Sequence, residues 1–188
     1  MKKLLITLSL TSAFIFANAS DLYNLEPTHS YVEFHYNHMG YSNPSGKWFT
    51  TGTINLDQKD LSKSSANILI NVSSINTGVT KLDEHLSGKD FFDVAKFPIA
   101  TFAGNKVSDI KGKHFDLSGI LTIHGVTKPV TLHVTENMRG INPITKLPSI
   151  GFSANTVIKR SDFGISKYVP MVSDEIKLDI EVEANNNK

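Results

Sequence analysis

The feature that most constrains this sequence is an alternation of apolar and polar residues with a period of two. It is clearest near the carboxyl end, where charged residues alternate with Ile176, Leu178, Ile180 and Val182. Successive side chains of a β-strand point to opposite faces of a sheet, so this pattern is typical of a strand with one buried face. We therefore expect an all-β protein.

Eight segments are predicted to be strands, and several are joined by links too short for anything but antiparallel pairing. Most are longer than the usual five or six residues. A few long strands favour a closed up-and-down barrel over a sandwich, because closure removes exposed edges. The predicted strands span residues 30–38, 47–57, 65–73, 99–108, 113–124, 126–136, 149–159 and 174–184.

The connection between the third and fourth predicted strands, residues 74–98, is long and contains one helical signal. Thr80 is the expected N-cap and Gly88 the expected stop. The connection is too apolar for a free loop, so we expect it to pack over an open end or seam of the sheet. Its three phenylalanines are Phe91, Phe92 and Phe97.

Residues 1–19 have the three parts of a cleavable signal peptide. Lys2 and Lys3 supply a positive start, residues 4–16 are mostly apolar, and residues 17–19 read Ala-Asn-Ala. The apolar stretch is shorter than the roughly 20 residues that cross a membrane. We expect an exported protein whose mature part, residues 20–188, is one domain.

Composition excludes several classes of protein. With no cysteine in the chain, disulfides, thiolate nucleophiles, cysteine-ligated zinc and a lipid-modified terminal cysteine are excluded. Cleavage would remove two of the 19 basic residues and leave 17 against 18 acidic ones, a net charge of −1. This balance argues against a nucleic-acid binder, and we expect no stable membrane anchor.

No motif predicts catalysis or a metal site. The chain has neither a nucleotide-binding glycine loop nor a G-x-S-x-G nucleophile elbow. Three histidines, His29, His35 and His38, lie close in sequence. Strand parity places His35 on the outer face and His38 on the inner face, so they are not expected to share an ion.

Two questions stay open from the residues themselves. The aromatic side chains on the inner faces either fill the barrel or line a cavity for an elongated apolar ligand. Arg160 and Asp162, which follow an apolar strand, form either a salt bridge or loop clamp, or a polar site at a cavity mouth.

The chain resembles the YceI-like family of exported bacterial proteins. The most distinctive segments are residues 90–93 (DFFD), 121–130 (LTIHGVTKPV) and 160–164 (RSDFG), and the resemblance runs from Tyr23 to about Ala184. Glu26 departs from it, because the family usually has Asp before the following proline.

The resemblance implies an eight-stranded antiparallel lipocalin-like barrel with one short helix in its long connection. It also implies a periplasmic or secreted protein that carries an elongated lipid: an isoprenoid quinone, a polyprenyl chain or a fatty-acid-like amide. Dimers occur in the family, so a homodimer is a further expectation. No cofactor other than the bound lipid is expected.

Candidate binding residues follow from placing that ligand in the barrel. The polar candidates for its head group are His38, Lys47, Arg160 and Asp162. Two alternatives are an enzyme acting on a lipid or small metabolite at the barrel mouth, and a stress-related partner-binding protein with a filled barrel. The expected lipid-contacting residues are Phe34, Tyr36, Trp48, Phe91, Phe92, Phe97, Phe102, Leu117, Leu121, Phe152, Ile158 and Phe163.

Overall fold

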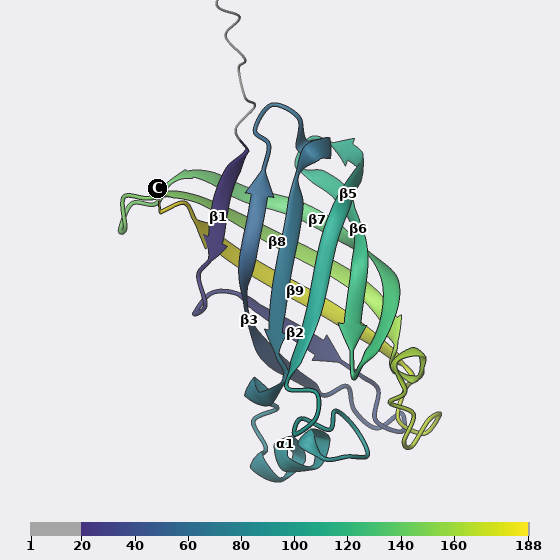
Figure 1. The fold of residues 1–188 in the computed structure, drawn as a ribbon. Helices are drawn as coiled ribbons and strands as arrows, with labels where there is room; N and C mark the ends of the chain where they lie inside the picture. Colours follow the sequence, from purple (N-terminus) through teal and green to yellow (C-terminus); the bar gives the residue numbers. More distant parts are fainter. Residues whose placement is uncertain (1–19, 188) are drawn as a thin grey trace, which may run out of the picture.

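In the computed structural model, residues 20–187 are described, and the expected signal peptide lies outside them. One antiparallel sheet closes on itself into a barrel (Figure 1). Short helical segments are η1 (Leu61–Lys63), η2 (Val72–Ser74), α1 (Thr80–Ser87) and η3 (Arg160–Phe163). The strands are β1 (Asp21–Leu25), β2 (Tyr31–His35), β3 (Ser45–Leu56), β4 (Ser65–Asn71), β5 (Ile99–Lys111), β6 (His114–Ile123), β7 (Val126–Ile141), β8 (Pro148–Lys159) and β9 (Glu175–Asn185).

The expected eight-stranded antiparallel barrel is confirmed, although one of its eight positions is shared by two short strands. Both β1 and β2 lie between β3 and β9. Along β3, Asn24 faces Thr53 whereas Tyr31 faces Phe49. The chain thus advances seven residues while its partner advances four. β1 and β2 are one strand interrupted by three extra residues.

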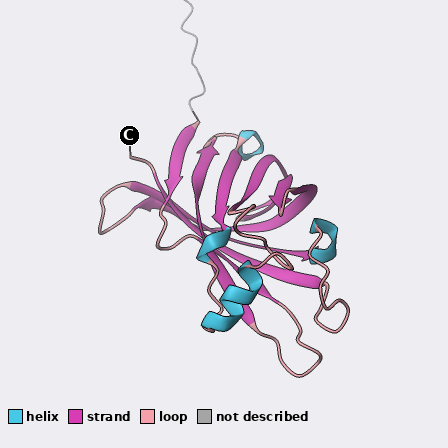
Figure 2. Cartoon of the chain, turned by 60° about the horizontal axis from the view of Figure 1, so that its bottom comes forward, coloured by secondary structure: helices cyan, strands magenta, loops and turns pink. Residues whose placement is uncertain are grey.

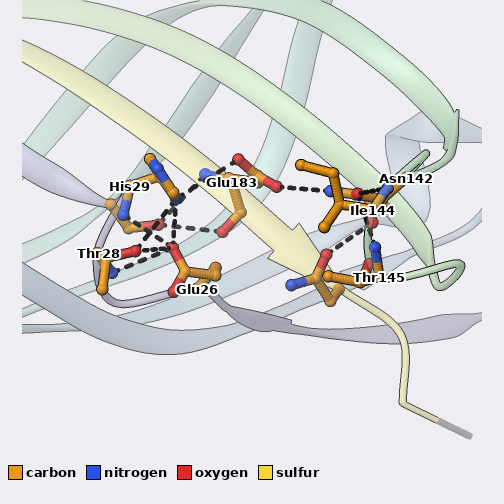
Figure 3. Close-up of polar contacts among 10 residues, drawn as sticks. Glu26, Thr28, His29, Asn142, Ile144, Thr145 and Glu183 are labelled. Atoms are coloured by element: carbon orange, nitrogen blue, oxygen red, sulfur yellow. Dashed lines mark hydrogen bonds and ion pairs between the residues drawn. The ribbon is translucent and has the colours of Figure 1, made fainter.

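The interruption is held by side chains. Ser30 is fully buried, and its Oγ donates to the carbonyl of Glu183 at 3.0 Å and accepts from the Glu183 amide at 3.2 Å. The Glu26 carboxylate accepts from the amides of Thr28 and His29, as Figure 3 shows. Partial burial opposes ionisation, but hydrogen bonds from the Thr28 hydroxyl, the His29 ring and these two amides outweigh it and lower the pKa of Glu26.

Close approach of β5 and β6 depends on facing glycines. Gly104 pairs with Gly119, and a bulge follows directly in β5. A Cβ on Gly119 would meet the carbonyl oxygen of Ala103 at 2.4 Å and the Cα of Gly104 at 2.7 Å. Glycine and bulge together let the sheet turn a corner here.

The predicted helix is present, and Gly88 is its C-cap as expected. Thr80 is not the N-cap: that position belongs to Val79, which makes no side-chain capping bond. The Asp83 carboxylate instead accepts from the amide of Thr77 at 2.8 Å and from its hydroxyl at 2.6 Å. This contact closes the turn that precedes the helix. The helix then begins after Val79, and Thr80 is its first residue.

The two ends of the barrel differ. The helix α1 and the loops 36–44 and 163–173 gather at one end, which comes forward in Figure 2. The opposite end is filled by a tightly packed cluster that contains Tyr23, Leu25, Leu56, Ile150 and Ala184, each 6% exposed or less. The barrel is therefore plugged at the end away from α1.

Candidate functional site

The barrel interior is hollow. A cavity of about 650 Å³ runs inside it, lined almost entirely by the inward side chains of the strands. Leu117, Leu132 and Ile158 point inward and pack against the core, yet they are only partly buried because part of each side chain faces this space. The interior is thus a lined cavity, and the filled barrel that was the alternative is not what the structure has.

The cavity opens at the α1 end. Of its lining residues, all within 20–187, only His38, Val79, His85 and Tyr168 are exposed. All four come from α1 or from the loops around it. Since the plug closes the opposite end, the cavity is accessible from this mouth.

Most of the sequence-predicted apolar residues line the cavity, those on strands as strand parity predicts and Phe91, Phe92 and Phe163 from outside the strands. The structure brings eleven of them together around the cavity: Phe34, Tyr36, Trp48, Phe91, Phe92, Phe102, Leu117, Leu121, Phe152, Ile158 and Phe163.

Phe97 is the exception, because the expectation that it contacts a ligand in the cavity does not fit its position. Its ring lies 4.7 Å from that of His124 and packs against Gly125, in the hairpin between β6 and β7, and it does not line the cavity. Phe97 lies in a loop, where no period tells which way a side chain points. The His124 ring also contacts η3, because its Nδ1 lies 3.3 Å from the carbonyl of Phe163.

The part of the cavity nearest the mouth is aromatic and contains unpaired polar atoms. The Trp48 ring lies 4.4 Å from Phe34 and 5.2 Å from Phe92. Trp48 Nε1 and Thr50 Oγ1 are buried without a hydrogen-bond partner in residues 20–187. Burial raises the pKa of Tyr36, which keeps its phenol neutral. Trp48, Thr50 and Tyr36 therefore supply uncharged polar groups, and the one Arg or Lys side chain that lines the cavity within residues 20–187 is Arg160.

Arg160 is buried and acts as a loop clamp. Its Nε donates to the carbonyl of Ser173, Nη2 to that of Val172, and Nη1 to those of Ile165 and Lys167, all at 2.9–3.0 Å. Four of the five guanidinium N–H donors are thereby used. Of the two readings the sequence left open, the geometry supports the clamp over the head-group site.

Asp162 is not the carboxylate that lies beside Arg160. It is exposed and does not line the cavity. The carboxylate near the guanidinium is that of Asp174, which accepts from the Ser161 amide at 2.9 Å and from its hydroxyl at 2.7 Å. Partial burial alone would raise the pKa of Asp174. These hydrogen bonds and the Arg160 charge outweigh that effect, so the pKa of Asp174 is lowered.

Lys47 lies on the outer face of the barrel and not at the mouth. Its Nζ sits over the rings of Tyr31 and Phe49, 5.2 and 5.6 Å from their centroids. Strand parity explains this position, because the adjacent Trp48 points inward.

His38 lies at the mouth, but in a loop. β2 ends at His35, three residues before its predicted end, and the chain then turns so that the His38 amide donates to Ser42. His35 is on the outer face as expected, 3.1 Å from Asp179. In residues 20–187 no three histidines or carboxylates gather in a way that could hold a metal ion.

One cluster of side chains at the mouth is not predicted by any pattern in the sequence. The rings of His85, Phe91 and Tyr168 lie within 4.9–6.5 Å of one another, and Lys167 forms an ion pair with Asp90 beside them. These contacts join the α1 segment to loop 163–173. The two segments are about eighty residues apart, and only the closure of the barrel brings them together.

Helices of residues 20–187 are all too short or too polar to cross a membrane.

Comparison with known proteins agrees with this architecture. Protein YceI of Salmonella arizonae is 38% identical over 164 residues, covering 87% of this chain and 85% of the relative. The Campylobacter jejuni YCEI protein is 33% identical, with a TM-score of 0.72 and coverage of 81% and 90%. BcnA of Burkholderia cenocepacia is 26% identical, with a TM-score of 0.74 and coverage of 82% and 95%.

A more distant structure shares the fold alone. It is described as a polyisoprenoid binding domain from Saccharophagus degradans implicated in plant cell wall breakdown, 15% identical, with a TM-score of 0.67 and coverage of 87% and 98%. The YceI-like domain family matches residues 23–184. With nearly all of the described barrel inside that match, the chain belongs to the YceI-like family.

Proposed function

We propose that this protein binds an elongated lipid inside its barrel and carries it through the periplasm. The observation that carries the proposal is the apolar cavity, about 650 Å³ in volume, plugged at one end and open at the other. Its volume falls within the range of about 300–1,000 Å³ typical of small-molecule sites. The description of the Saccharophagus degradans domain as polyisoprenoid binding supports the same class of ligand.

Cavity volume bounds the part of the lipid that is enclosed. At roughly 30 Å³ for a water-sized group, the cavity holds about twenty such groups, or about four isoprene units. Burial of each CH₂ group contributes about 0.8 kcal/mol, so a chain of this length outweighs the cost of ordering it. Affinity then depends little on polar contacts, which suits isoprenoid quinones, polyprenyl chains and fatty-acid-like amides alike.

We favour an uncharged head group. A pyrophosphate needs several cations, but Arg160 is engaged by backbone carbonyls and Lys47 lies on the outer face. The polar side chains that remain at the mouth are His38, His85 and Tyr168, which suffice to hydrogen-bond a quinone or an amide. The same arrangement favours binding over catalysis, since Arg160 has little free hydrogen-bonding capacity for a reacting group.

The periplasmic location rests on the signal-peptide pattern of residues 1–19. An aqueous space between two membranes is where a lipid needs a carrier with an enclosed apolar cavity. Cell fractionation of the full chain tests this part of the proposal independently of any ligand.

Native mass spectrometry of the purified protein, followed by lipid extraction, tests ligand binding. Ala154→Phe should lose most of the bound lipid, because Ala154 faces the cavity and a phenyl ring would occupy part of it. Asn155→Phe is the matched control, since the neighbouring residue points outward and is exposed. Protein that carries no lipid after export and takes up none of the three lipid classes would contradict the proposal.

A further inference from the structure

Exposed apolar side chains surround the mouth of the cavity. They are Met39 and Tyr41 in loop 36–44, and Tyr168 and Met171 in loop 163–173, with exposed fractions of 47%, 89%, 44% and 60%. Val79, ahead of α1, adds a fifth at 55%. We call these five residues the mouth rim.

The rim is built on a braced backbone. The Met39 amide donates to the Met171 carbonyl at 3.0 Å, and the Ser173 amide donates to the Asn37 carbonyl at the same distance. The Arg160 clamp fastens loop 163–173 from beneath through its four carbonyl bonds. The exposed side chains are therefore presented in a fixed arrangement.

The five rim side chains carry no formal charge, although exposed Lys81 and Glu84, of opposite charge, follow Val79 in α1. Residues 36–44 contain no Asp, Glu, Lys or Arg, and neither do residues 168–173. The adjoining Lys167 is paired with Asp90. An apolar surface with tyrosines and without charges suits the boundary between lipid head groups and acyl chains, where tyrosine is enriched.

The opposite end of the barrel differs in this respect. It also exposes apolar side chains, Met138, Ile141 and Ile144, at 67%, 63% and 87%. The charged residues Arg139 and Lys146 lie in the same segment, and the cavity does not open there. This end provides a matched comparison for the rim.

We propose that the mouth rim docks on the surface of a lipid bilayer, so that lipid passes directly between membrane and cavity. The inference goes beyond lipid binding and rests on the proposed function only for its cargo. Each CH₂ group that crosses open water costs about 0.8 kcal/mol, and a mouth seated in the membrane removes that exposure. The position of the rim around the opening, and its neutrality, favour a bilayer over a second copy of the chain, which would cap the mouth.

Vesicle flotation of the full mature protein tests the docking step. Met39→Ser/Met171→Ser should weaken association with phosphatidylcholine vesicles about tenfold, because two apolar side chains no longer enter the interface. Ile141→Ser/Ile144→Ser, which removes similar exposed area at the other end, should leave association unchanged. Since the rim is uncharged, added phosphatidylglycerol or added salt should change the wild-type result little.

A second measurement does not depend on affinity. The chain has no cysteine, so Tyr41→Cys and Ile144→Cys each accept one environment-sensitive dye. The two positions are 89% and 87% exposed in the free protein. Vesicles should blue-shift the dye at position 41 and leave the dye at position 144 unshifted.

Comparing lipid uptake from ethanol with lipid uptake from vesicles distinguishes membrane docking from the proposed lipid binding. Met39 and Met171 do not line the cavity, so their double variant should bind lipid supplied from ethanol normally and acquire it from vesicles about tenfold more slowly. Equal shifts at both dye positions, or wild-type transfer by the double variant, would overturn docking. So would a dimer that the same variant dissociates. Failure to bind lipid from ethanol would instead overturn the proposed function.

Discussion

A single buried arginine shapes the mouth. Arg160 replaces water for four carbonyl groups of loop 163–173, which would otherwise be left without partners in a partly buried turn. Burial lowers the pKa of its guanidinium, an effect that Asp174 opposes. The sequence offers this clamp only as one of two readings of Arg160, because hydrogen bonds to backbone carbonyls leave no pattern in the flanking side chains that would decide between them.

Arg160→Gln should lower the free energy of unfolding by about 3 kcal/mol or more, because several carbonyls lose a charged donor. Arg160→Lys should recover only part of this, since an ammonium cannot reproduce the planar fork. Urea unfolding measures both, with Lys159→Gln, exposed and adjacent, as the control. A variant of normal stability that has lost its lipid would instead make Arg160 a head-group ligand.

Asp174 should make the mouth sensitive to acid. Its pKa in the folded protein is below the unfolded value of about 3.9, so its contribution is complete above that pH and is lost as pH falls through the folded pKa. Asp174→Asn should therefore cost about 1–3 kcal/mol at neutral pH and less and less below about pH 4. Urea unfolding over a pH series measures this. The exposed Asp162→Asn should show no such convergence, and a cost for Asp174→Asn that does not vary with pH would contradict the assignment.

At the scale of elements, alternation was a sufficient guide wherever a strand is long. It predicts eight strands and places Phe34, Trp48 and Phe152 inward, although β7 continues to Ile141, five residues beyond its predicted end. It missed β1, whose five residues place Leu22 beside Tyr23 and so break the period, and whose pairing depends on β3 and β9 far along the chain. It also gave no direction for Phe97, because loops have no period.

The break between β1 and β2 depends on Ser30. Ser30→Ala should destabilise the protein by about 1–2 kcal/mol, because the Glu183 amide loses its acceptor and the Glu183 carbonyl keeps only the Glu26 amide as a donor. Hydrogen exchange should show faster exchange at Glu183 than in the wild type. Ser42→Ala, at an exposed loop position, is the control, and unchanged protection at Glu183 would show that the hydroxyl does not close the gap.

At the scale of the whole molecule, the sequence predicts a closed barrel but not whether it is hollow. The same inward leucines, isoleucines and phenylalanines suit either outcome. The difference arises from how far the closed sheet holds opposite walls apart, which is a property of all the strands together. Partial exposure of inward residues such as Leu117 and Ile158 reveals it only in three dimensions.

The plug at the closed end sets a limit on ligand length. Affinity for isoprenoid alcohols should rise with each added isoprene unit up to about four units and then level off, because further units lie outside the cavity. Tryptophan fluorescence of Trp48, the one tryptophan in the chain, can follow the titration. A continued rise well beyond four units would mean that the plug opens.

If the protein carries lipid as proposed above, a cavity with one mouth also fixes the order of events in delivery. Within the described barrel, cargo leaves by the route it entered, so a loaded molecule must release its lipid before it accepts another. Donor and acceptor membranes are then visited in turn and never together. Such a carrier follows ping-pong kinetics, in which double-reciprocal plots at different acceptor concentrations run parallel.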